Sequence, residues 1–316
     1  MDSPHFVVTT AVAARAVEYL REHARVSDVS MLPREAWDEA LASADGVLIG
    51  SGTPVDARFV AAAPRLRIVA SYSVGYDNVD LAALAARGIV LTNSRGSLNE
   101  AVADLTYALV VMGMRRLGLG IRWVRDGRWT EADMPYGHDV ADATLGLVGY
   151  GAIAQAVARR ARVSGMRVIY FNRTVVAAAD PETGAEYRDF DVLLAESDAV
   201  VALVPLTAQT RGMFGADAFA RMKPTAIFVN AARGAVADTR ALLDALDNGK
   251  IAGAALDVTD PEPLPPDHPL ANRDDVIVLP HIGSATVETR TRMAMVAAQN
   301  LVAFAEGKPL LTPVNA

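Results

Sequence analysis

The feature that most constrains this chain is a glycine-containing turn between a short apolar strand and a helix. Residues 145–148 read Leu-Gly-Leu-Val, and residues 149–154 read Gly-Tyr-Gly-Ala-Ile-Ala at the start of a helical stretch. A first glycine permits a tight turn, a second lets the backbone approach a pyrophosphate, and a small third residue allows close helix–strand packing. The N–H groups at the helix start attract phosphate. An ordinary glycine turn is the simpler alternative, but this context favours a dinucleotide site at Gly149, Gly151, Ala152 and Ile153.

Short apolar strands alternate with helical stretches on both sides of this turn, which indicates parallel sheets covered by helices. Two long helices, expected near 98–116 and 286–306, would carry the chain between two such sheets. We predict an α/β chain of two Rossmann-like domains with parallel sheets. Residues 1–96 and 286–316 would form a flavodoxin-like substrate-binding domain, and residues 97–285 an NAD(P)-binding domain inserted into it. The stretch 123–142 has no clear period and is interpreted as a connection that could serve as a dimer arm.

Composition and charge exclude several functional classes. No run reaches the roughly 18 consecutive apolar residues that a membrane span needs, and the formal net charge of −7 disfavours nucleic-acid binding. The chain has no cysteine, which excludes disulfides and thiolate chemistry, and no two of its five histidines have the spacing of metal ligands, so no metal is expected. The N-terminus lacks the positive region of a signal peptide, and we expect a cytoplasmic protein.

The end of the second strand of the cofactor domain bears on the choice between NADH and NADPH. An NAD-preferring site carries Asp or Glu roughly 20 residues after the glycine turn, but here the strand is followed by Asn172, Arg173 and Thr174. Arg173 could pair with a 2′-phosphate, which Asn172 would not repel. These three residues therefore favour NADPH, with NADH possible. A solvated Arg173 is the alternative, and Asp180 or Glu182 could supply the missing carboxylate.

Three ionisable side chains suit the reduction of a 2-oxo acid, and each follows a predicted strand: Arg233 after 226–230, Glu262 after 253–258 and His281 after 276–279. In such sheets ligands bind beyond the carboxyl ends of the strands. The guanidinium of Arg233 can hold a carboxylate and polarise the ketone. His281 can donate the proton to the developing alkoxide, and Glu262 can orient the imidazole and stabilise its charge. Taken singly, each residue has an ordinary explanation as surface charge or a turn residue.

Several motifs in one order resemble the D-2-hydroxyacid dehydrogenase family over nearly the whole chain. They are Leu203-Val-Pro-Leu-Thr207, Met222-Lys-Pro224, Val229-Asn-Ala-Ala-Arg-Gly234, Ala255-Leu-Asp-Val258, Pro261-Glu-Pro263 and Pro280-His-Ile-Gly-Ser-Ala-Thr286. The resemblance implies that Arg233 binds substrate, that His281 is the proton donor and that Glu262 assists it. It also implies that Asp257 lies near the nicotinamide carboxamide and that members form homodimers through the cofactor domain.

The resemblance assigns further residues to the two ligands. In the loop 73–77, the backbone N–H groups of Val74 and Gly75 would hold the substrate carboxylate. The cofactor would be contacted by four more residues: Thr106, Ala231, Ala232 and Gly283. Within the family, Gly127-Arg-Trp129 and Asn172-Arg-Thr174 look most like glyoxylate/hydroxypyruvate reductases, which often use NADPH.

The sequence thus predicts an NAD(P)H-dependent reductase that converts glyoxylate or hydroxypyruvate to the D-2-hydroxy acid. A larger acid such as 2-ketogluconate or phenylpyruvate would need the same chemistry, and the pocket cannot be sized from sequence. Oxidation of formate or phosphite is disfavoured because the features of 2-oxo acid reductases dominate. A dinucleotide-sensing binding protein without turnover is a further alternative, which the complete Arg–Glu–His set disfavours.

Overall fold

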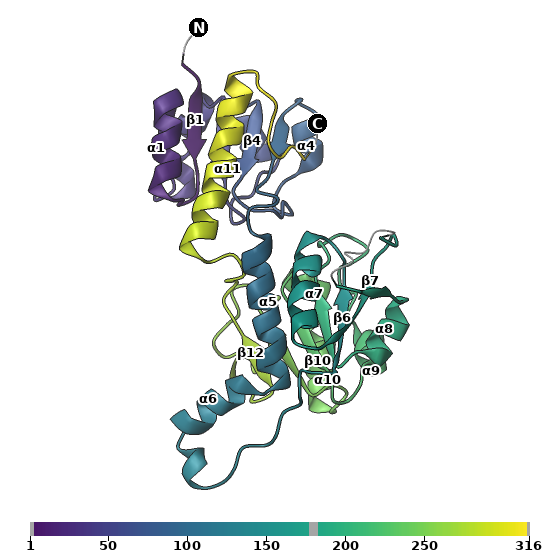
Figure 1. The fold of residues 1–316 in the computed structure, drawn as a ribbon. Helices are drawn as coiled ribbons and strands as arrows, with labels where there is room; N and C mark the ends of the chain where they lie inside the picture. Colours follow the sequence, from purple (N-terminus) through teal and green to yellow (C-terminus); the bar gives the residue numbers. More distant parts are fainter. Residues whose placement is uncertain (1–2, 177–182, 315–316) are drawn as a thin grey trace. The chain divides into compact units, whose positions relative to one another are not determined.

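The structure is a computed structural model that describes residues 3–176 and 183–314. The chain divides into two compact units, and each is described by itself (Figure 1). Unit 1 comprises Met1–Leu98 and Ala285–Ala316, and unit 2 comprises Asn99–Ser284. The expected boundaries were 96/97 and 285/286, two residues and one residue from those of the structure. All ladders in both sheets are parallel. The predicted α/β class with two parallel sheets is therefore confirmed.

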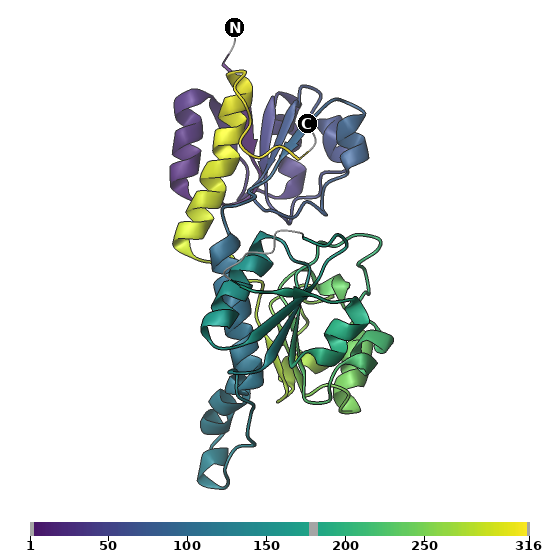
Figure 2. The ribbon, with the colours of Figure 1, turned by 45° about the vertical axis from the view of Figure 1, so that its right-hand side comes forward.

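Unit 1 is a five-stranded sheet in the order β2-β1-β3-β4-β5, which is the order of flavodoxin-like sheets. Helices α1 and α11 contact each other and cover one face (Figure 2), while α2, α3 and α4 cover the other. The strands are β1 His5–Val8, β2 Arg25–Asp28, β3 Gly46–Ile49, β4 Ile68–Ser71 and β5 Val90–Thr92. The helices are α1 Ala14–His23, α2 Asp38–Ala42, α3 Ala57–Ala62, α4 Leu81–Ala85 and α11 Val287–Ala305, with a 3-10 turn η1 at Arg34–Ala36.

Unit 2 is a seven-stranded sheet in the order β12-β11-β10-β9-β6-β7-β8. Starting from β8, this is the Rossmann strand order with one added strand. The order of the strands along the chain reverses between the parallel neighbours β6 and β9, which makes this the topological switch point. The strands are β6 Thr144–Val148, β7 Arg167–Phe171, β8 Glu186–Tyr187, β9 Ala199–Ala202, β10 Ile227–Asn230, β11 Gly253–Leu256 and β12 Val276–Val278. The helices are α5 Asn99–Met114, α6 Leu117–Arg125, α7 Ala152–Val163, α8 Phe190–Glu196, α9 Ala216–Arg221 and α10 Thr239–Asp247, with 3-10 turns η2 Arg128–Thr130, η3 Gly234–Val236 and η4 Pro269–Asn272.

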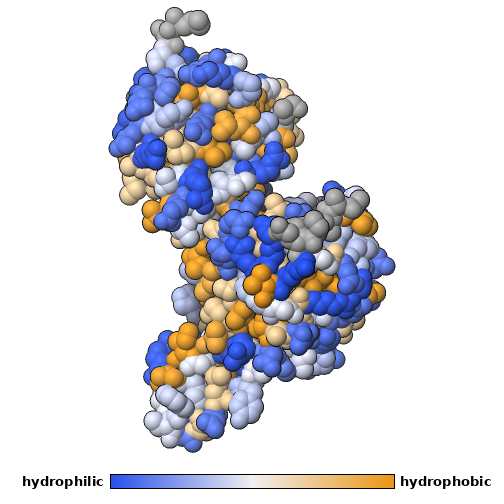
Figure 3. All heavy atoms as spheres, in the orientation of Figure 1, coloured by the Kyte–Doolittle hydropathy of each residue, from blue (hydrophilic) through white to orange (hydrophobic). Residues whose placement is uncertain are grey.

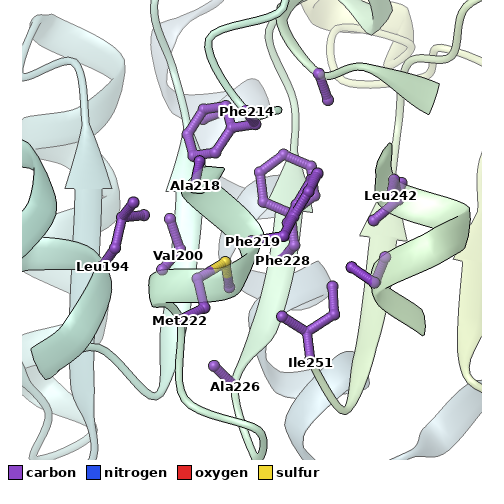
Figure 4. Close-up of a cluster of buried hydrophobic side chains, with 14 of the residues drawn as sticks. Leu194, Val200, Phe214, Ala218, Phe219, Met222, Ala226, Phe228, Leu242 and Ile251 are labelled. Atoms are coloured by element: carbon purple, nitrogen blue, oxygen red, sulfur yellow. The ribbon is translucent and has the colours of Figure 1, made fainter. Parts of the chain in front are cut away.

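The central strands of unit 2 are buried on both faces, so their side chains alternate between two cores. In β9, Ala199 and Val201 pack with α5 and α7, while Val200 and Ala202 pack with α8, α9 and α10. Phenylalanine rings form the centre of the second core: Phe219 of α9 meets Phe228 of β10 edge-on at 5.3 Å (Figure 4). This two-sided packing fixes the sheet whose carboxyl edge carries the predicted site.

One part of unit 2 differs from the sequence expectation. Arg116 adopts a left-handed backbone (φ 53°) after α5, and the chain then forms a further helix, α6. The sequence predicts one helix that ends near residue 116 and does not predict α6. Leu119 of α6 is buried, but three of its apolar side chains remain exposed: Leu117 (43%), Ile121 (63%) and Val124 (60%). Gly118 and Gly120 are poor helix formers and weaken the helical signal of this segment in the sequence.

Candidate active site

The turn after β6 has the geometry that a dinucleotide site needs. Gly149 has φ of 94°, and a Cβ there would lie 2.7 Å from the carbonyl oxygen of Leu203, so only glycine fits. A Cβ on Gly151 would meet no atom within 4 Å, which leaves the backbone open to an approaching ligand. Helix α7 begins at Ala152, and no side chain among the described residues caps it. Its first N–H groups, including that of Ile153, are thus suited to a phosphate at the switch point between β6 and β9.

The segment after β7 is shaped by local hydrogen bonds. The amide of Asn172 donates to the carbonyl oxygen of Thr174 (3.0 Å), and the Arg173 side chain between them belongs to an exposed residue. Beneath this segment the buried ring of Tyr150 stacks on Tyr170, with centroids 4.1 Å apart. Asp180 and Glu182, the alternative carboxylates, lie outside the described residues.

His281 and Glu262 form a direct pair. Nδ1 of His281 lies 2.7 Å from Oε1 of Glu262, and the two side chains are 40% and 41% exposed. His281 follows β12 with a left-handed backbone (φ 55°), and its N–H donates to the carbonyl oxygen of Asp257 (2.9 Å). Within the described part of the chain, Nε2 of His281 has no hydrogen-bond partner. A partly exposed imidazole held through one nitrogen presents the other nitrogen to a substrate.

Asp257 holds the loop that carries His281. Its two carboxylate oxygens accept the N–H groups of Ile282 (2.7 Å) and Gly283 (2.8 Å). Burial raises the pKa of Asp257, although these two N–H groups act in the opposite direction. The sequence placed Asp257 and Gly283 beside the cofactor; the structure shows them bonded to each other under the His281 loop. Their contact with a cofactor stays a prediction.

Arg233 extends from a loop after β10 that packs tightly on the loop bearing Glu262. A Cβ on Gly234 would lie 1.9 Å from the carbonyl oxygen of Thr259, so the glycine lets the two backbones touch. The guanidinium of Arg233 donates to the carbonyl oxygen of Ala232 (2.8 Å). The two loops and the Glu262–His281 pair therefore bring the three predicted catalytic residues to one edge of the sheet.

Asn230 is a positioning residue that the sequence analysis did not single out. Its amide donates to the carbonyl oxygen of Arg233 (3.0 Å), and its side-chain oxygen accepts the N–H of Ala232 (3.1 Å). The side chain is 1% exposed, so it acts as a buried brace for the Arg233 loop. Its place at the start of the Asn-x-x-Arg-Gly motif was the available signal.

The remaining predicted contacts lie in varied surroundings. Thr106 is fully buried in α5, and its hydroxyl donates to the carbonyl oxygen of Val102 (2.7 Å). Ala231 is half-buried directly after β10, as is Ala232. Val74 and Gly75, in unit 1, are half-buried after β4. Among the described residues, no group of three His, Cys, Asp or Glu side chains could hold a metal ion.

Comparison with known proteins decides the family. The family model "D-isomer specific 2-hydroxyacid dehydrogenase, NAD binding domain" matches residues 107–283, more than half of the chain. The chain belongs to this family. It is therefore an oxidoreductase, an NAD(P)-dependent 2-hydroxyacid dehydrogenase that reduces 2-oxo acids with a nicotinamide dinucleotide. The resemblance noted in the sequence is confirmed.

Individual relatives of this dehydrogenase cover nearly all of it. A glyoxylate reductase of Korarchaeum cryptofilum is 43% identical over 311 residues, which are 96% of this chain and 94% of the relative. The crystal structure of a glyoxylate reductase from Paecilomyes thermophila has 33% identity and a TM-score of 0.91, with 99% of each chain covered. An NADPH-dependent glyoxylate/hydroxypyruvate reductase from Sinorhizobium meliloti, solved with NADP and malonate, has 33% identity and a TM-score of 0.88, with 99% of this chain and 97% of that chain covered. No described helix of the dehydrogenase is long and apolar enough to cross a membrane.

Proposed function

We propose that this dehydrogenase reduces glyoxylate or hydroxypyruvate to the D-2-hydroxy acid, with NADPH as the favoured donor and NADH as a possible one. The observation that carries the proposal is the pairing of His281 with Glu262 on the sheet edge that also holds the Arg233 loop. The 43% identical relative from Korarchaeum cryptofilum, a glyoxylate reductase, supports the substrate class.

The proposed chemistry assigns one task to each side chain. The guanidinium of Arg233 binds the substrate carboxylate and polarises the ketone. His281 donates its Nε2 proton to the carbonyl oxygen as the C–O double bond is reduced, and Glu262 stabilises the imidazolium and keeps Nδ1 oriented. The reduced nicotinamide, when bound, supplies the hydride that reaches the carbonyl carbon. The N–H groups of Val74 and Gly75 hold the carboxylate.

The proposed cofactor residues fit a dinucleotide without further change. Gly149, Gly151, Ala152 and Ile153 would hold the pyrophosphate, since the turn is open at Gly151 and the helix start is uncapped. Arg173, between Asn172 and Thr174, would pair with a 2′-phosphate. Contacts from Thr106, Ala231, Ala232, Asp257 and Gly283 complete the proposed site.

The direct test is the initial rate of NADPH and NADH oxidation with four acids: glyoxylate, hydroxypyruvate, phenylpyruvate and 2-ketogluconate. Faster turnover of the first two, with NADPH preferred, is the expected result. Turnover restricted to a larger acid would retain the chemistry and overturn the proposed substrate. Equal use of both cofactors would overturn the proposed role of Arg173.

We also propose a homodimer through unit 2 and a cytoplasmic location, where nicotinamide cofactors are supplied. Hydrophobic side chains gather where Figure 1 draws α6 (Figure 3), and five large apolar residues between positions 117 and 136 are exposed: Leu117, Ile121, Val124, Trp129 and Tyr136. Such a patch is typical of an interaction surface. Light scattering should give twice the 33.4 kDa of one chain, and Ile121→Asp should shift the mass toward a single chain. A single-chain mass for the unchanged protein would contradict the dimer.

A further inference from the structure

In the loop after β4, the carbonyl oxygens of residues 72–76 each accept a hydrogen bond, and the two residues that follow β5 supply three of the donors. For residues 72–76 the donors are, in order, the Ser94 hydroxyl to Tyr72 (2.8 Å), the Ser94 N–H to Ser73 (3.2 Å), the Asn93 amide to Val74 (3.0 Å), the Ser73 hydroxyl to Gly75 (2.8 Å) and the Val79 N–H to Tyr76 (3.0 Å). In an extended strand successive carbonyl groups point to opposite sides. Here the carbonyl groups of three successive residues, 72–74, all accept hydrogen bonds from Asn93 or Ser94, so the loop is bent into a fixed shape.

This shape determines where the N–H groups of the loop point. In a planar trans peptide the N–H of one residue points away from the carbonyl of the residue before it. The carbonyls of residues 73, 74 and 75 are held, so the N–H groups of Val74, Gly75 and Tyr76 are directed away from these donors. No group in residues 3–176 or 183–314 accepts a hydrogen bond from these three N–H groups. Successive backbone N–H groups without acceptors form a concavity suited to an anion.

The residues that grip the loop are themselves buried and held. Asn93 is 5% exposed and Ser94 is fully buried. The side-chain oxygen of Asn93 accepts the N–H of Arg95 (3.2 Å), and its backbone is bonded to Thr312 through both its N–H and its carbonyl oxygen. Thr312 in turn is held by Asn300 of α11. The hydrogen bonds that Asn93 and Ser94 make to the loop are therefore tied to the rest of unit 1.

We propose that Asn93 and Ser94 are positioning residues of this dehydrogenase, which hold the N–H groups of Val74, Gly75 and Tyr76 in place to bind the carboxylate of a small 2-oxo acid. Neither side chain needs to touch the substrate. Loss of either donor would free a carbonyl group, and the peptide plane behind it could then rotate. This inference rests on the proposed function, which names the carboxylate as the ligand.

The test compares three variants by their steady-state kinetics with glyoxylate. Asn93→Ala removes the amide that holds the carbonyl of Val74. Ser94→Ala removes the hydroxyl that holds the carbonyl of Tyr72. Because this second substitution hardly changes the volume of a buried side chain, the test remains possible if Asn93→Ala does not fold. Arg87→Met is the matched control, because Arg87 also donates to backbone carbonyls in unit 1, those of Val60, Ala63 and Pro64. These carbonyls precede β4, at the opposite end of the strand from the loop.

For Asn93→Ala we expect the KM for glyoxylate to rise roughly tenfold, which corresponds to about 1.4 kcal/mol. For Ser94→Ala we expect a rise of about threefold, because one of two neighbouring bonds remains. kcat and the Kd of NADPH should stay close to those of the unchanged enzyme. Arg87→Met should lower the melting temperature without raising KM. An unchanged KM in both Asn93→Ala and Ser94→Ala would overturn the inference. A KM rise in Arg87→Met as large as in Asn93→Ala would also overturn it.

Failure of the proposed function would be visible separately. If the unchanged enzyme reduces only a larger 2-oxo acid, KM for that acid is measured in the same variants, since the carboxylate is common to all. If it reduces none, the proposed function fails, and oxalate binding measured by calorimetry replaces KM. Weaker oxalate binding by Asn93→Ala would then support the positioning role, and equal binding would overturn it.

Discussion

Two turns in this molecule follow a parallel strand and present backbone N–H groups, but they are built in different ways. The turn after β6, in unit 2, takes its shape from its own glycines, since Gly149 has a positive φ and no room for a Cβ. The turn after β4, in unit 1, takes its shape from side chains at the end of another strand, Asn93 and Ser94. The first can be recognised within six residues of sequence. The second becomes visible only when β4 and β5 are placed side by side.

The difference predicts how each turn fails. A turn shaped by glycine should be sensitive to a Cβ added where φ is positive and space is lacking, as at Gly149, and less sensitive to changes in distant side chains. A turn shaped by a neighbouring strand should tolerate small changes in its own residues and respond to changes about 20 residues away. Variants of the two turns should therefore affect different ligands, with the cofactor affected in unit 2 and the acid in unit 1.

The largest expected effect on activity comes from a residue outside both turns, His281, and the effects of the turn variants can be compared with it. His281→Gln removes the proposed proton donor, so kcat should fall by roughly 10²–10⁴, while the Kd of NADPH stays unchanged. His268→Gln is the matched control, because His268 caps the short turn at Leu270 and does not contact Glu262. A normal kcat for His281→Gln would remove His281 from the mechanism.

The turn after β6 should be broken by a single methyl group. In Gly149→Ala the added Cβ would press on the carbonyl of Leu203, and we expect NADPH binding to weaken by on the order of 100-fold. Gly88→Ala is the control, because Gly88 also has a positive φ (63°) but open space around it. That variant should lose only about 1–2 kcal/mol of stability and bind NADPH normally. Fluorescence titration with NADPH checks both variants, and normal binding by Gly149→Ala would refute the argument.

A smaller effect is expected at the segment after β7. Arg173→Ala should raise the KM for NADPH about tenfold, close to 1.4 kcal/mol, and leave the KM for NADH unchanged, because only NADPH carries the 2′-phosphate. Arg188→Ala is the matched control, since Arg188 lies nearby but is paired with Glu186 (2.6 Å). Equal changes for the two cofactors would mean that Arg173 is only solvated.

The strands that the sequence predicted well are those buried on both faces. The apolar runs of β6 and β10 are too short for a buried helix, so a buried strand is the interpretation that remains. The edge strands β2 and β8 were missed, because their partly exposed residues, including Arg25 and Glu186, carry no apolar pattern. Helix α6 was missed because Gly118 and Gly120, inside a helix of nine residues, weaken its helical pattern in the sequence.

The residues of the candidate site also differ in how well a sequence pattern reveals them. Arg233, Glu262 and His281 could be proposed from the sequence because each follows a strand and belongs to a motif, and the order of the strands brings them to one edge; their catalytic roles stay a prediction. Asn230 and Asn93 were missed. Their amides brace the backbone of loops through buried hydrogen bonds, and a buried amide leaves no periodicity or charge pattern in a sequence.

The stabilities of the two units also depend on pH in different ways, and a small effect is expected in unit 1. His5 of β1 is 3% exposed, and its ring nitrogens lie 2.9 Å from the hydroxyl of Ser27 and 3.1 Å from that of Ser43. Burial lowers the pKa of His5 below its ordinary value of 6.5, although a hydrogen bond with the backbone of Ser43 acts in the opposite direction. The unfolded chain therefore takes up this proton more readily than unit 1 does. The resulting contribution to stability is complete above about pH 6.5 and is lost as the pH falls through the lowered value.

In unit 2 the effect of pH has the opposite sign, because burial raises the pKa of Asp257, so the contribution of Asp257 to stability grows on acidification.

Replacing His5 with Gln removes the group that takes up a proton on unfolding. The decline in the melting temperature of unit 1 between pH 7 and pH 5 should then become less steep. Unit 1 contains one of the three tryptophans, Trp37, so a background of Trp123→Phe and Trp129→Phe makes fluorescence report on unit 1 alone. If the decline is as steep with Gln as with His5, other groups control the acid response of unit 1.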